Sequence, residues 1–423
     1  MSSPTDIALT GWGVVSPLGV GRPAFAAALA EGRSGVRLLQ AFDGRGLTSR
    51  LAAEAPDFEP KAYVRPRKSL KVMSRDIQMA FAAADMAWTH AGLGPGLVDP
   101  ERCGVTLGAD MIMFELEEAA PAFRASMQEG RARRELWAPR AMPELYPLWM
   151  LKYLPNMAAC HVSIALDLRG PNNTISVGEV SSLLAFGEAA RAIGRGGADV
   201  MLAGGTSCRI HPTVFAFRQR YELSRREDDP AGAVRPFDAD RDGLVHGEGA
   251  AVFVLESRRH LEARRGKPLA WLVGHASHCE PQGAERKPRG IALRHAIQSG
   301  LRSARLQPGQ LGFVSADGRS TRHDDAVEAQ AIRELLGGVA VTAPKSYFGV
   351  LGAAGGAVEL AAALVAFETG QLVPTLNYRR PDPTCPVNVV REAGQPLDAP
   401  TALVLNQAPT GQAAAIVLRA GDA

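Results

Sequence analysis

The chain is poor in cysteine. Its 423 residues include five, Cys103, Cys160, Cys208, Cys279 and Cys385, which lie far apart and never form a CxxC pair. Such spacing gives no sign of a disulfide framework. It predicts reduced, mostly buried thiols in a cytoplasmic protein.

No secretion signal is visible in the sequence, and a long apolar run and a strong net charge are missing from it. No basic and apolar leader precedes the strand-like DIALTGWGVVSPLG, and the longest apolar run, around Ala361 to Phe367, is too short to cross a bilayer. The formal net charge of +3 is too small to indicate nucleic acid or an anionic membrane. We therefore expect neither partner.

What the chain has in quantity is apolar residues, which make up 46% of it and can form a large core. Its most informative stretch is GPNNTISVGEVSSLLAFGEAARAIGRGGADVMLAGG, from Gly170 to Gly205. The pattern predicts a strand ending at Val177, a sharp turn at Gly178 and a buried helix that stops at Gly196. A strand, a tight turn and a helix form a nucleophile elbow, which presents one side chain at a helix N-terminus. Here that side chain is Glu179.

This stretch resembles the active-site elbow of the β-ketoacyl-acyl carrier protein synthases, the condensing enzymes, whose pattern is roughly GPNxTVxTACASSLxAIGxA. The matching residues are Gly170, Pro171, Asn172, Thr174, Ser181, Ser182, Gly187 and Ala189. The nucleophilic cysteine of the family does not match, because Glu179 occupies its position.

Other motifs carry the same resemblance in family order. TGWGVVSPLG (Thr10 to Gly19) resembles the family's first strand and turn, and RPFDADRDGLVHGEGAAVFVLE (Arg235 to Glu256) follows its PFDxxRDGxVxGEGAxxxxLE signature. The resemblance implies an α/β protein of thiolase fold, with two similar halves in a five-layered α-β-α-β-α core. We expect these halves at residues 1-256 and 257-423, with the polar stretch from Gly266 to Gly290 as their boundary.

Within the second motif, DADRDG also imitates the start of a calcium loop. Such a loop needs a bidentate glutamate six residues after Gly243, where this chain has Gly249. A structural loop that runs into a core strand is therefore the favoured interpretation.

Both catalytic histidines of the resemblance are replaced. The family's HGTST motif reads DGRST here, with Asp317 at the histidine position, and KSxxGHxxGAAG reads KSYFGVLGAAG, with Val350. Neutral imidazoles donate hydrogen bonds to developing enolate charge, which neither replacement can do. The final glycine-rich turn, NSFGFGGxN in relatives, reads NQAPTGQ from Asn406 and contains Pro409, which has no N–H.

The residues around these positions are kept. Lys345, Glu359 and Asp325 match residues that, in relatives, support the active site from behind. Asp317, Asp324, Asp325 and Glu328 would also suit a metal cluster, but a solvated loop with supporting pairs explains them as well. We expect no metal and no cofactor.

Residues 111 to 154 are irregular and rich in large apolar side chains. Met111, Met113, Phe114 and Trp149 are placed where the family has its acyl-pocket and dimer-interface walls, although packing in a core is the alternative. A second candidate surface is basic, and it would suit an acidic acyl carrier protein unless it is merely a solvated helix face. Its residues are Arg65, Arg67, Lys68, Lys71 and Arg75.

Three functions stay open. The favoured one is a chain-length-factor-like pseudo-ketosynthase, which forms a heterodimer with an active synthase of fatty acid or polyketide biosynthesis and shapes its acyl pocket. The second is a repurposed acyl-thioester hydrolase or decarboxylase that uses Glu179 as base or nucleophile. The third is a homodimer that only binds an acyl chain or acyl carrier protein. Whether the chain is an enzyme, and which acyl length it serves, is left undecided by the sequence.

Overall fold

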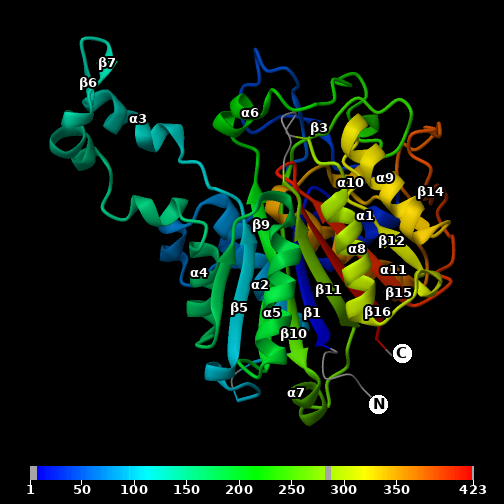
Figure 1. Cartoon of the computed structure of the whole chain (residues 1–423). Coiled ribbons are helices and arrows are strands. Elements are labelled where there is room, and N and C mark those ends of the chain that lie inside the picture. The colour runs from blue at the N-terminus through cyan, green and yellow to red at the C-terminus, as the bar shows by residue number, and fades with distance from the viewer. Residues whose placement is uncertain (1–6, 95, 282–286, 422–423) are drawn as a thin grey trace.

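The computed structural model describes residues 7–94, 96–281 and 287–421. Its two halves share one strand order (Figure 1). The strands of the first half are β1 (Ile7–Ser16), β5 (Cys103–Ala109), β8 (Asn172–Ile175), β9 (Val200–Cys208) and β10 (Glu248–Ser257). Those of the second half are β11 (Ala270–Cys279), β12 (Phe313–Ser315), β13 (Ala340–Thr342), β15 (Thr401–Gln407) and β16 (Gln412–Ala420).

The order across the sheet is β8-β5-β9-β10-β1 in the first half and β13-β12-β15-β16-β11 in the second. In both halves the first three strands run parallel to each other, and the remaining neighbours are antiparallel. The fold is therefore a duplication, which no repeat in the amino-acid letters reveals.

The halves join where Ile7 to Leu9 of β1 pair with Leu272 to Ala270 of β11, which makes one 12-stranded sheet. Two short strands, β2 (Gly19–Val20) and β14 (Asn388–Val389), complete it. Within the expected boundary from Gly266 to Gly290, residues 270–279 form β11, an internal strand with a buried first half, so the stretch is not a linker throughout. Residues 282–286 of the stretch lie outside the described residues. The division between residues 256 and 257 stays a prediction.

Helices form three layers: one outside the strands of each half, and a central one between the strands of the two halves. The outer helices are α2 (Arg75–His90) and α4 (Met157–Leu166) on the first half, and α8 (Ile291–Ala304) and α9 (Arg322–Leu336) on the second. The two central helices are α5 (Ser181–Gly194) and α11 (Gly355–Thr369), which share one hydrophobic cluster with strands of both halves. The structure thus confirms the five-layered α/β arrangement.

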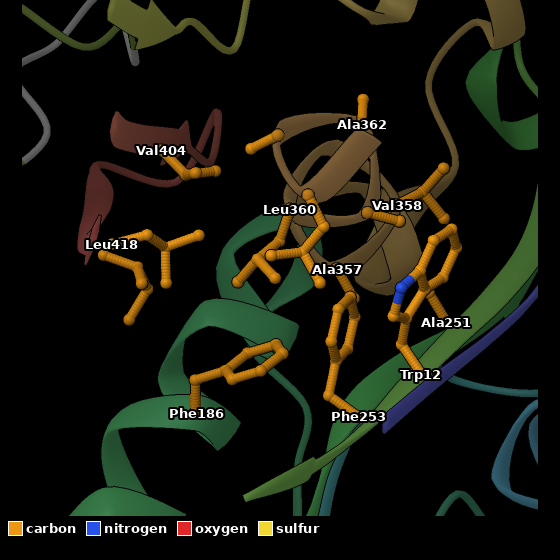
Figure 2. Close-up of a cluster of buried hydrophobic side chains, with 14 of the residues drawn as sticks. Trp12, Phe186, Ala251, Phe253, Ala357, Val358, Leu360, Ala362, Val404 and Leu418 are labelled. Carbon is orange, nitrogen blue, oxygen red and sulfur yellow. The ribbon is translucent and has the colours of Figure 1, made fainter. Parts of the chain in front are cut away.

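The central layer contains a cluster of buried aromatic and aliphatic side chains (Figure 2). The ring of Phe253 on β10 stacks on Trp12 of β1, with centroids 6.2 Å apart, and meets Phe186 of α5 edge-on at 5.3 Å. Residues 352–369, which include α11, are long and apolar enough to cross a membrane, with a mean hydropathy of 1.2. Since 83% of that window is buried inside the protein, this is a core helix. The sequence expectation, which considered only the run at 361–367, missed its full length.

The remaining elements are short. The other α-helices are α1 (Arg22–Ala30), α3 (Leu116–Ala125), α6 (Pro212–Arg218), α7 (Arg258–Ala263) and α10 (Lys345–Phe348). The single turns of 3₁₀ or π helix are η1 (Pro60–Ala62), η2 (Arg67–Val72), η3 (Pro100–Arg102), η4 (Arg134–Leu136), η5 (Trp137–Ala141), η6 (Met142–Glu144), η7 (Trp149–Tyr153), η8 (Gly178–Val180), η9 (Pro230–Gly232), η10 (Pro308–Gln310) and η11 (Gly352–Ala354). Two small hairpin sheets pair β3 (Arg37–Leu38) with β4 (Leu51–Ala52) and β6 (Met127–Gln128) with β7 (Arg131–Ala132).

One segment projects from the body. Residues 115–148, with α3 and the hairpin β6–β7, extend away from the sheet and form an arm, drawn in cyan to green at the upper left of Figure 1. Several of its large apolar side chains are exposed, so packing in the central core does not account for them. They are Leu116, Phe123, Met127, Met142, Tyr146 and Leu148.

All five cysteines are free. Only Cys103 and Cys385 are buried, so the expectation that most of the thiols are buried is wrong. Cys279 is exposed because it ends β11, at an edge where the alternating pattern turns outward.

Candidate functional site

Glu179 lies where the elbow was predicted. It sits in η8, between β8 and the first residue of α5, after Gly178, whose φ of 63° is a left-handed conformation that glycine adopts at low cost. The hydroxyl of Ser181 braces the turn, because it accepts from the Val177 N–H at 2.8 Å and donates to the Gly178 carbonyl at 2.6 Å. The side chain of Glu179 is buried, with 6% of its residue surface exposed.

An arginine neutralises this carboxylate. Arg209, which follows β9 and is 2% exposed, places Nη1 2.8 Å from Oε1 of Glu179. The same guanidinium donates through Nε to Asp110 at 3.2 Å, and Asp110 also accepts from the hydroxyl of Ser207 at 2.8 Å. Glu179 is therefore one end of a buried ion-pair chain that crosses from the elbow to the ends of β5 and β9.

The charges set the ionisation of this pair. Burial alone would raise the pKa of Glu179, but the positive charges of Arg209, Arg319 and Arg218 outweigh burial and hold that pKa well below its usual value. Glu179 and Asp110 in turn raise the pKa of Arg209 against the effect of burial. Both groups stay charged at neutral pH. A carboxylate with so low a pKa is a weak base.

Gly352 makes room for the same ion-pair chain. Its φ is 54°, and an added Cβ would lie 2.1 Å from Oδ2 of Asp110 and 2.6 Å from Nε of Arg209. The next residue, Ala353, donates its N–H to Asp110 at 3.3 Å. The turn that precedes α11 therefore packs directly on the ion-pair chain that includes Glu179.

Asp317 belongs to a second buried ion-pair network. Its Oδ2 accepts from Nη2 of Arg319 at 2.6 Å, and its Oδ1 accepts from Nζ of Lys345 at 2.8 Å. Lys345 also pairs with Glu359 on α11, and the amide of Asn406 donates to both Asp317 and Glu359. All five side chains are at most 2% exposed, and their formal charges cancel.

Asp325 and Glu328 on α9 hold the loop that carries Asp317. Asp325 accepts from the N–H groups of Arg319 and Phe237, and Glu328 accepts from those of Asp317 and Gly318. These carboxylates face backbone donors. Within residues 7–94, 96–281 and 287–421, no group of three or more His, Cys, Asp or Glu side chains is placed to hold a metal ion.

The calcium-like loop is used in the same way. Asp238 accepts from the N–H groups of Arg379 and Arg380, and Asp242 accepts from Ser224 at 2.8 Å. These bonds clamp the loop to a neighbouring one, which supports the structural interpretation.

Val350 is buried and faces a histidine. Its backbone forms a parallel bridge with His246, whose side chain is 2% exposed and lies between the rings of Phe215 and Tyr221 at about 6 Å from each. Neither ring nitrogen of His246 has a hydrogen-bond partner among the described residues. Burial and the charges of Arg209 and Arg218 hold the pKa of His246 well below its usual value, so the imidazole is neutral.

The four apolar candidates divide into two pairs. Met111, which is 74% exposed, and Met113 line a cavity of 280 Å³ beside Arg209. Phe114 and Trp149 instead pack on Tyr153 at the base of the arm, with ring centroids 6.5 and 5.7 Å away. The assignment of all four to an acyl pocket or interface stays a prediction.

Cys208 also lines that cavity, and it is the one thiol near Glu179 that needs to be weighed as a nucleophile. Its Sγ donates to Glu248 at 3.1 Å, and burial raises its pKa well above the usual value. Since the thiolate is the reactive form, Cys208 is unreactive at neutral pH.

The structure removes one of the five residues from the basic candidate surface. Arg75 pairs with the buried Glu248 at 2.6 Å and stacks over Phe58, so it supports the core. The other four, Arg65, Arg67, Lys68 and Lys71, are exposed beside and within η2.

Three residues of the site were missed by the sequence reasoning. Arg319 was visible in principle, since DGRST shows a cation two residues after Asp317. His246 stands at a variable position of the PFDxxRDGxVxGEGA signature, and Arg209 lies outside every motif considered. Only the fold shows that β9 carries Arg209 to the elbow.

Comparisons with known proteins point in one direction. The model of "Beta-ketoacyl synthase, N-terminal domain" matches residues 5–260, and that of "Beta-ketoacyl synthase, C-terminal domain" matches residues 269–379. The chain is 33% identical over 420 residues to the tetracenomycin polyketide synthase ketoacyl synthase alpha subunit of Streptomyces glaucescens, covering 98% of this chain and 97% of that one.

Two solved structures are similar along the whole length. "The ishigamide ketosynthase/chain length factor" superposes with a TM-score of 0.84 at 28% identity, over 98% of this chain and 99% of that one. A type II polyketide synthase acyl carrier protein in complex with its ketosynthase bound to the hexaketide, AntDE:AntF, also reaches 0.84, at 29% identity over 99% of this chain and 100% of that one.

Proposed function

The chain belongs to the beta-ketoacyl synthase family, and we propose that within it this protein is a subunit without condensing activity of its own, which pairs with a cysteine-bearing synthase and shapes that partner's acyl pocket. It acts in this proposal in the cytoplasm, in fatty acid or polyketide biosynthesis. The role is that of a chain length factor, a component named in one of the similar structures.

The observation that carries the proposal is the neutralisation of the two acidic replacements, Glu179 and Asp317, by buried cations. Glu179 is held by Arg209, and Asp317 is held between Arg319 and Lys345. A condensing enzyme needs a nucleophile that attacks and donors that stay free to meet an enolate. Here the groups at those positions are used to hold the scaffold together.

The geometry speaks against Glu179 as the base of a hydrolase or decarboxylase. A general base works best with a pKa near the operating pH, whereas the arginines hold the pKa of Glu179 well below its usual value.

The proposed carrier protein contact uses the exposed basic residues beside η2, Arg65, Arg67, Lys68 and Lys71. A similar structure contains an acyl carrier protein with its ketosynthase, which makes such a partner reasonable for this chain. Charge reversal at two of these residues is expected to weaken carrier protein binding. Binding by the variant should also depend less on salt concentration than binding by the parent.

The decisive experiment is reconstitution. The purified chain is mixed with acyl and malonyl carrier proteins, alone and with a cysteine-bearing synthase of the same family, and the products are analysed by mass spectrometry. We expect no elongation by the chain alone, a complex with the synthase in gel filtration, and a changed product length in the mixture.

A matched control is Glu179→Cys, which restores the nucleophile but neither histidine. It is expected to stay inactive in condensation. Elongation by the unmodified chain alone would refute the proposal, and a stable homodimer that binds carrier protein but no synthase would replace it with the binding-only function. Loss of a measurable thioesterase activity in Glu179→Gln would instead favour the repurposed enzyme.

A further inference from the structure

The cavity beside Arg209, described above, is lined by both apolar and charged side chains. Its 280 Å³ lie between the segment after β5 and the helix α6 with the residues that follow it. Its lining combines apolar side chains, cationic side chains and the carboxylate of Asp110, which is already paired with Arg209. The apolar side chains are Met111, Met113, Val214 and Phe217, and the cationic ones are Arg209, Arg218 and Arg220.

The cationic side is only partly satisfied by the protein. Nη1 and Nη2 of Arg209 are both buried and make no hydrogen bond among the described residues; Nη1 lies 2.8 Å from Glu179 as an ion pair, Nε bonds Asp110, and Nη2 has neither kind of partner. A buried unpaired donor destabilises the protein, because it has lost its bond to water without replacing it. The unfilled donor belongs to a side chain that is 2% exposed and that lines the cavity.

Arg218 repeats the pattern. It is half-buried, and its one contact of note is with Tyr221, over whose ring its guanidinium carbon lies at 5.3 Å. In the described part of the chain no carboxylate lies within 4 Å of its guanidinium, and burial together with the charge of Arg209 lowers its pKa. Two guanidinium groups that repel each other across a cavity are stabilised together by an anion placed between them.

We propose that this cavity binds an oxyanion on a short apolar stem, with the oxyanion held by Arg218 and the free Nη2 of Arg209, and the stem against Met111, Met113 and Phe217. The oxyanion is a carboxylate of an organic acid or the phosphate of a phosphate ester, since a guanidinium fork suits both. Every residue named in the site belongs to this chain, so the site can be tested on the purified chain alone.

The cavity is small for an apolar chain alone. At 280 Å³ it is near the lower end of ordinary ligand pockets. An uncharged acyl chain entering it would cover Arg218, which has no carboxylate partner, without supplying an anion, which is costly. The cationic wall therefore selects for a charged ligand.

The test is a calorimetric titration of the purified full chain with three probes of equal chain length: octanoate, octyl phosphate and octanol. We expect at least one of the two anionic probes to bind, at least tenfold tighter than octanol. Which of the two binds more tightly identifies the source of the oxyanion as a carboxylate or a phosphate.

Arg218→Gln is expected to weaken the anionic probe at least tenfold, while Arg218→Lys keeps part of the affinity. Arg225→Gln, an exposed arginine that does not line the cavity, is the matched control and should bind as the parent does. Circular dichroism checks that each variant is folded.

Equal binding of octanol and the anionic probes, or binding that is unchanged in Arg218→Gln, would overturn the proposal. Failure of all three probes to bind would overturn it as well. None of these results depends on finding a synthase partner, so the site and the proposed function can fail separately.

Discussion

The two altered positions of the site differ in how completely the protein closes them. At Asp317, every charged group of the network has a partner of opposite charge inside the protein, and the groups are at most 2% exposed. At Glu179, the ion pair with Arg209 leaves one buried donor unfilled, and a second arginine stands nearby without a carboxylate. The first network serves stability alone, whereas the second one borders a cavity and keeps capacity to bind.

The largest effect is expected at the closed network. Asp317→Asn leaves Arg319 and Lys345 buried with one counter-charge fewer, and breaking a buried ion pair typically costs about 3–5 kcal/mol. Urea unfolding at pH 7 measures the loss. Adding Arg319→Gln should recover part of it; a single variant as stable as the parent would show that the network is not the main support of this loop.

A somewhat smaller loss is expected at the open network. Arg209→Gln removes the partner of Glu179 and should cost about 3 kcal/mol at pH 7. The folded pKa of Glu179 is lowered, so its stabilising contribution is present above its unfolded pKa near 4.5 and is lost as the pH falls through the folded value. In the variant the folded pKa rises, and the deficit should shrink when unfolding is repeated at pH 4.

The double variant Glu179→Leu with Arg209→Met serves as the control for that experiment. It removes both charges at similar volume and should be closer to the parent in stability than Arg209→Gln. A deficit that stays constant from pH 7 to pH 4 would rule out ionised Glu179 as its source.

The neutral imidazole of His246 gives a pH signature of intermediate size. Its folded pKa lies well below 6.5, so below pH 6.5 the unfolded chain binds a proton that the folded chain does not. The parent should lose about 1.4 kcal/mol more than His246→Phe between pH 7.5 and pH 5.5. Thermal unfolding at the two pH values measures the difference, and parallel profiles would mean that His246 is solvated or paired.

The smallest effect is expected at Arg218. Arg218→Met replaces a half-buried cation that has no carboxylate partner, so the free energy of unfolding should change by less than about 1 kcal/mol. We expect the change to be an increase. Arg241→Met is the matched contrast. Its guanidinium pairs with Asp382 at 2.6 Å and bonds three backbone carbonyls, and its loss should cost clearly more in the same denaturant titration.

Local patterns in the chain predicted the elbow closely. The helix after Glu179 begins at Ser181, and Gly196 follows its end with a φ of 74°, because glycine at these points is a requirement of backbone geometry. The strand that follows, β9, runs from Val200 to Cys208, since it is buried between β5 and β10 and pairs along its whole length with β10.

The partners of the site could not be predicted in the same way. Arg209 and Glu179 are thirty positions apart, and their contact follows from parallel pairing of β9 with β5. The duplication could not be predicted from the sequence either. The two halves share the order and direction of their strands, but the side chains that fill their layers differ. Met111 and Phe114 are three residues apart, yet Met111 lines the cavity and Phe114 packs at the base of the arm.

The pairing of β1 on both sides at Ile7 to Leu9 has a consequence for how the molecule opens. These three residues lie between Ser257 to Leu255 of β10 and Leu272 to Ala270 of β11, so local fraying at this point would separate the two copies of the fold. Their amide hydrogens should therefore exchange with deuterium only when the whole chain unfolds, and should rank among the slowest in the protein.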